Sequence, residues 1–288
     1  MPDKKNIYGI IGLPLNHSLS PLIHNTVFKS LGINAEYQLF PLLEEELENF
    51  FQELRMQSNP IMGLNVTVPY KEKVLEYFDN LSPYARKVMA VNTIAISPDR
   101  SLTGFNTDGP GFLTHLTEIG FSIAGKRIAL LGAGGTARAI ISTLCLIQER
   151  PHSIRIYNRH PEKAIALIHD LHQRLDTTIV QAVSSIEDLN IELADLLINT
   201  TPVGLKTEDP CLMEEGSLHE GLLVYDVIYN PSRTKLLESA EKKGAQISNG
   251  LGMLFYQGVL AFHHWMGYEL DQKTKSKIRK ILQNEGAP

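Results

Sequence analysis

The sequence has little cysteine and no long apolar run. Only two cysteines occur in 288 residues, Cys145 and Cys211, and their spacing indicates neither a metal site nor an oxidising compartment. Because Cys145 lies in an apolar run, we interpret it as a small core residue. The apolar run over 7–11 is too short for a secretory signal, and no run is long enough to span a membrane, so we expect a cytoplasmic protein.

The chain also has no excess of positive charge. It carries 27 Lys and Arg against 32 Asp and Glu, for a net charge of −5, which is not the electrostatic pattern of a nucleic-acid-binding protein. The basic residues are scattered, so a membrane-surface patch is not predicted. With 43% hydrophobic and 20% charged residues the composition is that of a globular protein, and the length predicts two domains.

What the chain does have is a glycine-rich stretch at its centre. Residues 127–139 have the pattern of a buried strand, a glycine turn and the first turn of a helix. Gly132 allows a tight turn, Gly134 lets the backbone approach a pyrophosphate, and Ala137 is a small residue where the helix packs on the strand. The helix start offers free N–H groups to a phosphate. A turn without a ligand is the alternative, but the strand–turn–helix context favours a dinucleotide site.

The next predicted strand, 153–157, ends in a basic loop. NAD sites usually place Asp or Glu at this point, whereas this chain has Asn158 and Arg159, with Lys163 one turn later. A carboxylate repels the 2′-phosphate of NADP, and a guanidinium binds it in bidentate fashion. The loop therefore favours NADP over NAD, the alternative being a solvated basic loop.

Strands and helices alternate along the chain, which predicts an α/β fold with mostly parallel sheets. We expect an N-terminal mostly parallel α/β substrate domain over 1–106 and a C-terminal Rossmann-type domain over 107–252. The last helices, in 253–288, are expected to return to the first domain and complete it. Ser20 is predicted as the N-cap of a helix that begins with Pro21, and 249–252 as a turn. The strands are predicted at 6–12, 36–40, 61–67, 92–97, 101–105, 127–131, 153–157, 178–182, 195–199, 223–227 and 246–248.

Polar residues follow several of these elements. Ser18 and Ser20 lie beside a helix start, where neutral donors suit a carboxylate, unless Ser20 is a plain cap. Asn65 and Thr67 point to the same side of a strand end. Lys71 follows them at the edge where open α/β sheets bind ligands, although a surface lysine is the alternative. Asp108, in the polar stretch 104–109, is a further candidate functional residue, although a helix N-cap is the alternative.

Together these motifs resemble the shikimate dehydrogenase family, in the family's order, from Gly9 to about Gly267. The shared signatures are residues 16–21, residues 65–69 with Lys71, residues 106–108, and residues 132–135. The resemblance implies reversible, NADP-dependent reduction of 3-dehydroshikimate to shikimate, in chorismate and aromatic amino-acid biosynthesis. It implies a small-molecule substrate and no metal, and it leaves monomer or homodimer open.

The resemblance also implies roles for individual residues. Lys71 and Asp108 correspond to the catalytic pair. The implied substrate ligands are Ser18, Ser20, Asn65, Thr67, Lys71, Asn92, Asp108, Tyr229 and Gln257. The implied cofactor ligands are Gly132, Ala133, Gly134, Gly135, Thr136, Asn158, Arg159, Lys163, Thr200, Ile228 and Gly250. In one departure, His160 stands where the family often has threonine, which exchanges a phosphate contact for a titratable one.

The chemistry of the pair follows from its charges. Lysine is an ammonium at neutral pH, and a carboxylate about 4 Å away stabilises that charge by up to roughly 4 kcal/mol before desolvation. Asp108 would keep Lys71 ready to protonate a carbonyl oxygen; which of the two is the formal base stays open. The alternatives are a quinate or dual quinate/shikimate dehydrogenase using NAD or NADP, and a non-catalytic nucleotide-binding regulator.

Overall fold

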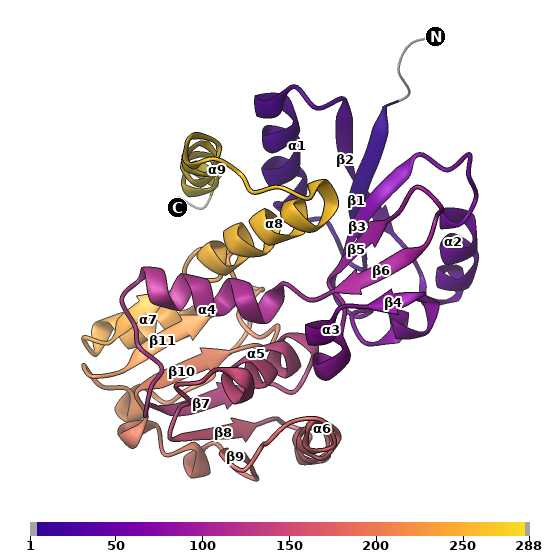
Figure 1. Cartoon of the computed structure of the whole chain (residues 1–288). Coiled ribbons are helices and arrows are strands. Elements are labelled where there is room, and N and C mark those ends of the chain that lie inside the picture. The colour runs from indigo at the N-terminus through magenta and orange to yellow at the C-terminus, as the bar shows by residue number, and fades with distance from the viewer. Residues whose placement is uncertain (1–4, 286–288) are drawn as a thin grey trace. The chain divides into compact units, whose positions relative to one another are not determined.

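The computed structural model describes residues 5–285 and divides them into two compact units. Unit 1 comprises 5–111 and 254–285, and unit 2 comprises 112–253. The divisions fall inside two helices, α4 (Asp108–Glu118) and α8 (Leu251–Met266), which are labelled in Figure 1. The ends of the expected domains, 1–4 and 286–288, lie outside the described residues.

Unit 1 contains a six-stranded sheet in the order β2-β1-β3-β5-β6-β4. The pairs β1–β2, β1–β3 and β4–β6 are parallel, whereas β5 runs antiparallel to both β3 and β6. The predicted strands 92–97 and 101–105 correspond to β5 and β6, which form a hairpin in a mostly parallel sheet, and Arg100 in its turn has a φ of 68°. The strands are β1 (Asn6–Gly12), β2 (Ala35–Pro41), β3 (Ile61–Val66), β4 (Asn80–Leu81), β5 (Thr93–Ile96) and β6 (Leu102–Phe105).

The helices of unit 1 cover both faces of this sheet. On one face, Leu47, Phe51 and Leu54 repeat at helical spacing and bury the apolar side of α2 against the strands. On the other face, Phe28 of α1 packs against Tyr8 of β1, with ring centroids 5.1 Å apart. The helical segments are α1 (Ser20–Leu31), η1 (Glu44–Glu46), α2 (Leu47–Leu54), η2 (Lys73–Tyr77), α3 (Pro83–Val88) and α9 (Gln272–Glu285), together with the unit 1 parts of α4 and α8.

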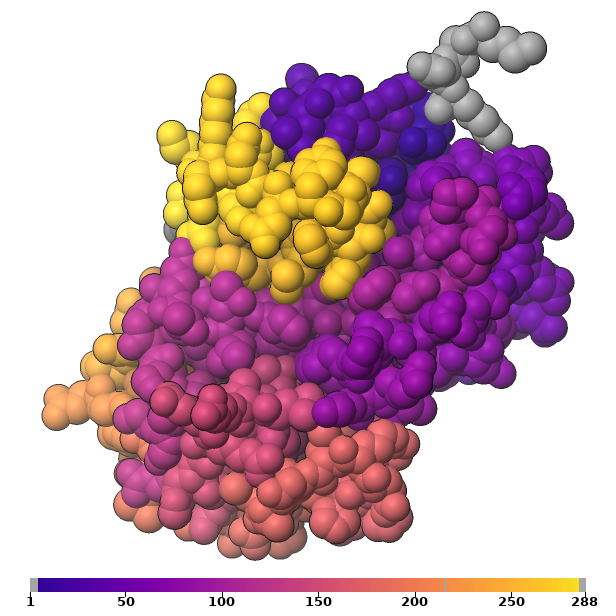
Figure 2. All heavy atoms as spheres, viewed as in Figure 1, coloured from indigo at the N-terminus to yellow at the C-terminus, as the bar shows by residue number. Residues whose placement is uncertain are grey.

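The C-terminal helices belong to unit 1, as predicted. Trp265 of α8 lies over Gly63 of β3, where an added Cβ would stand 2.6 Å from the indole ring. The indole Nε1 donates to the Ile94 carbonyl oxygen at 2.9 Å. In Figure 2 the yellow C-terminal residues lie beside indigo α1, which α9 contacts. The glycine at position 63 is thus required by the close approach of a residue 202 positions away in sequence.

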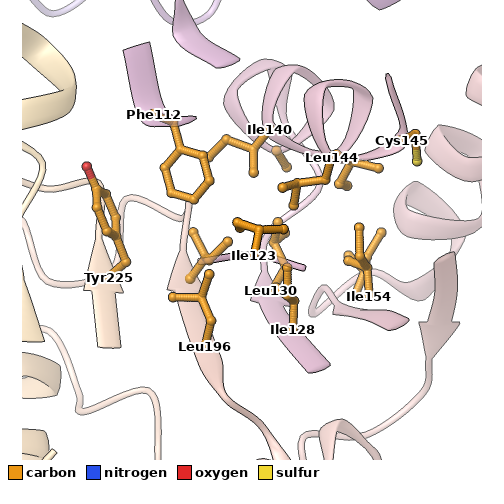
Figure 3. Packing of buried hydrophobic residues seen from close by; sticks show 14 of the residues in the cluster. Phe112, Ile123, Ile128, Leu130, Ile140, Leu144, Cys145, Ile154, Leu196 and Tyr225 are labelled. Atoms are coloured by element: carbon orange, nitrogen blue, oxygen red, sulfur yellow. The ribbon is translucent and has the colours of Figure 1, made fainter. Parts of the chain in front are cut away.

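Unit 2 contains a fully parallel six-stranded sheet in the order β12-β11-β10-β7-β8-β9. Alternate residues of its strands enter two separate cores: Ile128 and Leu130 pack with α4, α5 and α6, and Ala129 and Leu131 pack with α7. Figure 3 shows the first of these cores. The elements are β7 (Arg127–Leu131), α5 (Gly135–Leu146), β8 (Ser153–Tyr157), α6 (Pro161–His172), β9 (Val180–Val183), η3 (Glu187–Leu189), η4 (Ile191–Leu193), β10 (Leu196–Asn199), η5 (Glu215–Ser217), β11 (Leu223–Asp226), α7 (Lys235–Lys242) and β12 (Gln246–Ser248).

Two local predictions were wrong. Ser20 is the first residue of α1 and does not cap it; Leu19 holds the N-cap position, with no capping bond from its side chain. The predicted turn 249–252 contains the start of α8, because the Asn249 Oδ1 accepts from the Leu251 N–H at 3.1 Å. Gly252 lies inside that helix, and glycine is required there because an added Cβ would overlap the His115 ring. This glycine therefore serves packing and not a turn.

None of the helices within residues 5–285 is both long enough and apolar enough to cross a membrane.

Candidate functional site

The expected catalytic pair is in direct contact. Lys71 lies beyond the end of β3, and Asp108 is the first residue of α4, after β6. The Lys71 Nζ stands 2.6 Å from the Asp108 Oδ2. The Asp108 side chain is fully buried and the Lys71 side chain is 11% exposed. The protein thus holds an ion pair largely away from water, where charge–charge attraction is stronger than at a surface.

Asn92 holds the other oxygen of Asp108. Its Nδ2 donates to the Asp108 Oδ1 at 2.8 Å and to the Thr107 Oγ1 at 3.0 Å. Its Oδ1 accepts from the Thr107 N–H at 2.8 Å and from the Thr93 Oγ1 at 3.0 Å. Both Asp108 oxygens therefore have partners, which is required of a buried charge. Asn92 is itself only 4% exposed.

Asn65 joins the same hydrogen-bonded network from β3. Its Nδ2 donates to the Asn92 carbonyl oxygen and to the Thr93 Oγ1, both at 3.1 Å. Its Oδ1 accepts from the Tyr37 hydroxyl at 2.8 Å. Sequence reasoning missed Thr93, Thr107 and Tyr37 as members of this network. The two threonines lie inside the polar motifs already singled out, whereas Tyr37 has no local signal beyond that of a core strand residue.

Four further candidate substrate ligands, Ser18, Ser20, Thr67 and Gln257, are also in unit 1. The Ser18 Oγ accepts from the Ser20 N–H at 3.3 Å at the start of α1. Thr67 directly follows β3, with its methyl group against Gly12, where an added Cβ would overlap it. Gln257 is half-buried on α8. Tyr229, the remaining candidate, belongs to unit 2.

The glycine turn of unit 2 has the backbone geometry that its sequence predicts. Gly132 follows β7 with a φ of +105°, and an added Cβ would lie 2.5 Å from the Thr200 Oγ1. The Thr200 hydroxyl donates to the Leu131 carbonyl oxygen at 2.6 Å. At Gly134, the N-cap of α5, an added Cβ would meet no atom within 4 Å. The start of α5 is therefore open to a ligand, which fits a pyrophosphate.

This turn lies where the strand order reverses. The chain leaves β7 toward β8 and β9 and later returns to the other side of β7 at β10. In open α/β sheets, ligands bind at the carboxyl ends of the strands at such a point. Gly132 directly follows β7, and Thr200 directly follows its neighbour β10. The sheet thus brings two candidate cofactor ligands together that are 68 residues apart.

A buried carboxylate supports the neighbouring strand end. Asp226, at the end of β11, accepts from the Asn199 Nδ2 at 3.0 Å, the Ile228 N–H at 3.0 Å and the Thr234 Oγ1 at 2.8 Å. Burial raises the pKa of the Asp226 carboxyl, and these three hydrogen bonds act in the opposite direction. Nearby, the Gly250 N–H donates to the Ile228 carbonyl oxygen at 3.1 Å. The candidate ligands Ile228 and Gly250 are therefore in contact.

The basic loop after β8 is presented to solvent. Arg159, His160 and Lys163 are exposed. The Asn158 Nδ2 donates to the His160 carbonyl oxygen at 2.9 Å, which shapes the loop. The His160 Nδ1 lies 3.5 Å from the Glu162 Oε1. In the described part of the chain, no three His, Cys, Asp or Glu side chains are grouped so that they could hold a metal ion.

In comparisons with known proteins, the chain matches one family. The family model for the shikimate dehydrogenase substrate binding domain matches residues 10–94. The shikimate dehydrogenase (NADP(+)) of Methanothermobacter thermautotrophicus is 42% identical over 266 residues, which cover 92% of each chain.

Solved structures agree with the sequence relatives. A shikimate dehydrogenase from Aquifex aeolicus is 35% identical, with a TM-score of 0.86 over 97% of this chain and 99% of its own. A shikimate 5-dehydrogenase from Thermus thermophilus, in complex with NADP(H) and shikimate, is 32% identical, with a TM-score of 0.82 over 96% and 99%. The resemblance found in the motifs is confirmed over nearly the whole chain, and the protein belongs to the shikimate dehydrogenase family.

Proposed function

We propose that this protein is an NADP-dependent shikimate dehydrogenase, which catalyses the reversible reduction of 3-dehydroshikimate to shikimate. The buried contact between Lys71 and Asp108 is the observation that carries the proposal. The relative that is 42% identical has the same activity in its name. The reaction places the enzyme in chorismate and aromatic amino-acid biosynthesis. The oligomeric state, monomer or homodimer, and the cytoplasmic location stay predictions.

The two units are proposed to have different roles, one in substrate binding and catalysis and the other in NADP binding. Residues 1–106 with 253–288 form the substrate-binding and catalytic domain of the proposal, and the match of 10–94 to a substrate binding domain supports this role. Residues 107–252 form the NADP-binding Rossmann domain, a role supported by the parallel sheet and the open glycine turn. The boundaries between the two compact units lie after Gly111 and after Met253, within a few residues of these limits.

In this mechanism the bound nicotinamide supplies the hydride and the protein supplies the proton. The ketone oxygen of 3-dehydroshikimate gains negative charge as its carbon is reduced, and the Lys71 ammonium donates a proton to that oxygen. Asp108 stabilises the ammonium through its Oδ2, while Asn92 holds the Oδ1 and with it the orientation of the carboxylate. In the oxidative direction the same pair accepts the proton.

The remaining substrate ligands are assigned by their donors and acceptors. Ser18 and Ser20 offer neutral donors at the start of α1, which suit the substrate carboxylate. Asn65, Thr67, Asn92, Asp108 and Gln257 have polar side chains that suit the ring hydroxyl groups. Tyr229 is proposed as a further substrate ligand.

The cofactor ligands follow the same logic. Gly132, Ala133, Gly134, Gly135 and Thr136 surround the open start of α5 and are proposed to hold the pyrophosphate, with Thr200 beside them. Asn158, Arg159 and Lys163 are proposed to bind the adenosine phosphate, because their loop presents positive charge to solvent. Ile228 and Gly250 are proposed to lie near the nicotinamide.

A steady-state assay tests the proposal directly. The purified protein is given shikimate or quinate with NADP⁺ or NAD⁺, and reduced cofactor is followed by its absorbance. We expect the largest kcat/KM for shikimate with NADP⁺. Equal turnover of quinate would support the dual-specificity alternative. No cofactor reduction in any combination would contradict the proposed activity.

A further inference from the structure

We propose that Tyr37 is a positioning residue of the substrate site: its hydroxyl orients the Asn65 amide, so that Asn65 offers a substrate hydroxyl only an acceptor. The inference rests on the proposed function and adds a residue that acts through Asn65. It also assigns the direction of one substrate hydrogen bond, because the substrate hydroxyl must be the donor.

The orientation of the Asn65 amide follows from its partners. One partner of Nδ2 is the Asn92 carbonyl oxygen, which can only accept, so the nitrogen must face it. The Nδ2 also donates to the Thr93 Oγ1 at 3.1 Å. An amide nitrogen has two hydrogens, and both are therefore used inside the protein. What Asn65 retains is its Oδ1.

The Tyr37 hydroxyl occupies one lone pair of that oxygen and leaves the other lone pair for a ligand. Its hydroxyl donates to the Asn65 Oδ1 at 2.8 Å, and a carbonyl oxygen has a second lone pair. Without this bond only the two partners of the Nδ2 would oppose rotation of the amide. The second lone pair can accept from a ligand hydroxyl but cannot bind a ligand carbonyl oxygen.

Both the backbone and the ring of Tyr37 are held by neighbouring residues. Its backbone N–H donates to the Asn25 Oδ1 at 2.9 Å, and its carbonyl oxygen accepts from the Asn25 Nδ2 at 3.1 Å. Its ring stacks on His24, with centroids 4.6 Å apart and planes at 14°. Both contacts come from α1, the helix that begins at Ser20. Helix α1 and the Asn65 amide are thus linked through Tyr37, which is 3% exposed.

The test is a Tyr37→Phe variant, which removes the hydroxyl and retains the ring. Loss of one neutral hydrogen bond to a ligand-orienting group predicts a KM for shikimate about 5- to 10-fold higher, with kcat changed less than about twofold. The KM for NADP⁺ should not change. Tyr8→Phe is the matched control, because Tyr8 is 5% exposed, lies 5.0 Å from the Trp265 ring and belongs to the same aromatic cluster. We expect its KM values to equal those of the wild type.

A double-mutant cycle separates positioning from a structural role. If Tyr37 acts through Asn65, Tyr37→Phe should raise the KM for shikimate no further in an Asn65→Ala background. Equal fold-changes in both backgrounds, or an unchanged KM in the single Tyr37→Phe variant, would overturn the inference. Failure of the wild-type enzyme to oxidise shikimate would instead overturn the proposed function.

Discussion

The two candidate binding regions differ in what holds their polar side chains. In unit 1, Lys71, Asp108, Asn92 and Asn65 hydrogen-bond to one another around a carboxylate with no exposed surface. In unit 2, Arg159 and its basic neighbours are exposed on a loop. Proton transfer requires accurate placement, which a buried network provides before the substrate binds. A phosphate needs mainly positive charge, which an exposed loop can supply.

The same contrast separates two histidines. His24 of unit 1 is 1% exposed and stacked among aromatic rings, and burial lowers its pKa to about 3. The side chain of His160 in unit 2 is 51% exposed and lies near Glu162. We therefore expect a change of pH to affect the stability of the protein through His24, whereas His160 is accessible to a ligand.

The largest effect is expected where the buried network would be broken. Lys71→Ala should lower kcat by about 10²- to 10⁴-fold with much less change in the KM for shikimate, because it removes the proposed proton donor. Steady-state kinetics with shikimate and NADP⁺ measures both values. Lys73→Ala is a matched control, since Lys73 is 44% exposed and pairs with Glu44 at the surface. A Lys71→Ala enzyme that kept half of the wild-type kcat would remove this lysine from the mechanism.

The next largest effect concerns His24 and the free energy of unfolding. In the unfolded chain a histidine takes up a proton near pH 6.5, whereas native His24 stays neutral down to about pH 3. Protons then favour the unfolded state, so stability falls as pH drops through this window. Between pH 7.5 and 5, the wild type should lose about 2 kcal/mol more than His24→Phe, which keeps an aromatic ring on Tyr37.

Urea unfolding of both proteins at the two pH values measures this difference. Burial also lowers the pKa of His264, to about 4, but this residue is present in both proteins, so its effect cancels. Equal pH dependence in the two proteins would show that His24 takes up its proton in the native state as readily as in the unfolded chain.

A smaller effect is expected from the exposed loop. Arg159→Ala should weaken NADPH binding about tenfold and leave NADH binding within about twofold, because only NADPH carries the 2′-phosphate. The loss should shrink in high salt, since an exposed contact is screened. Arg150→Ala, at the other end of β8 and paired with Asp176, is the control for removing a surface arginine. Equal weakening of both cofactors would contradict phosphate recognition by Arg159.

The smallest effect is expected from His160. If its imidazole contacts the 2′-phosphate, His160→Thr should weaken NADPH binding about two- to threefold and leave NADH binding unchanged. Glu162, 3.5 Å from the Nδ1, competes for the same ring and limits the effect. Fluorescence titration of both cofactors with wild type and His160→Thr measures the difference. Equal NADPH affinity in the two proteins would leave His160 without a role in cofactor binding.

The sequence by itself determined the features that depend on neighbouring residues. The strands 6–12, 127–131, 153–157 and 246–248 have their predicted bounds, because apolar patterning acts over a few residues. The turn at Gly132 could be predicted because a φ of +105° is accessible to glycine and to few other residues. The same local reasoning failed at Gly252, where the requirement for glycine comes from His115, more than a hundred residues away in sequence.

Only the tertiary structure decided which polar side chains meet. Lys71 and Asp108 are 37 residues apart, and their contact depends on the strand order β3-β5-β6, which no local pattern specifies. The family resemblance named Asn65 and Asn92, but the directions of their hydrogen bonds became visible only in the folded network. The role of Tyr37 could not be predicted from the sequence, because a buried tyrosine in a strand is equally well explained by packing. Its hydroxyl has a specific partner because the parallel strands β2, β1 and β3 place it beside Asn65.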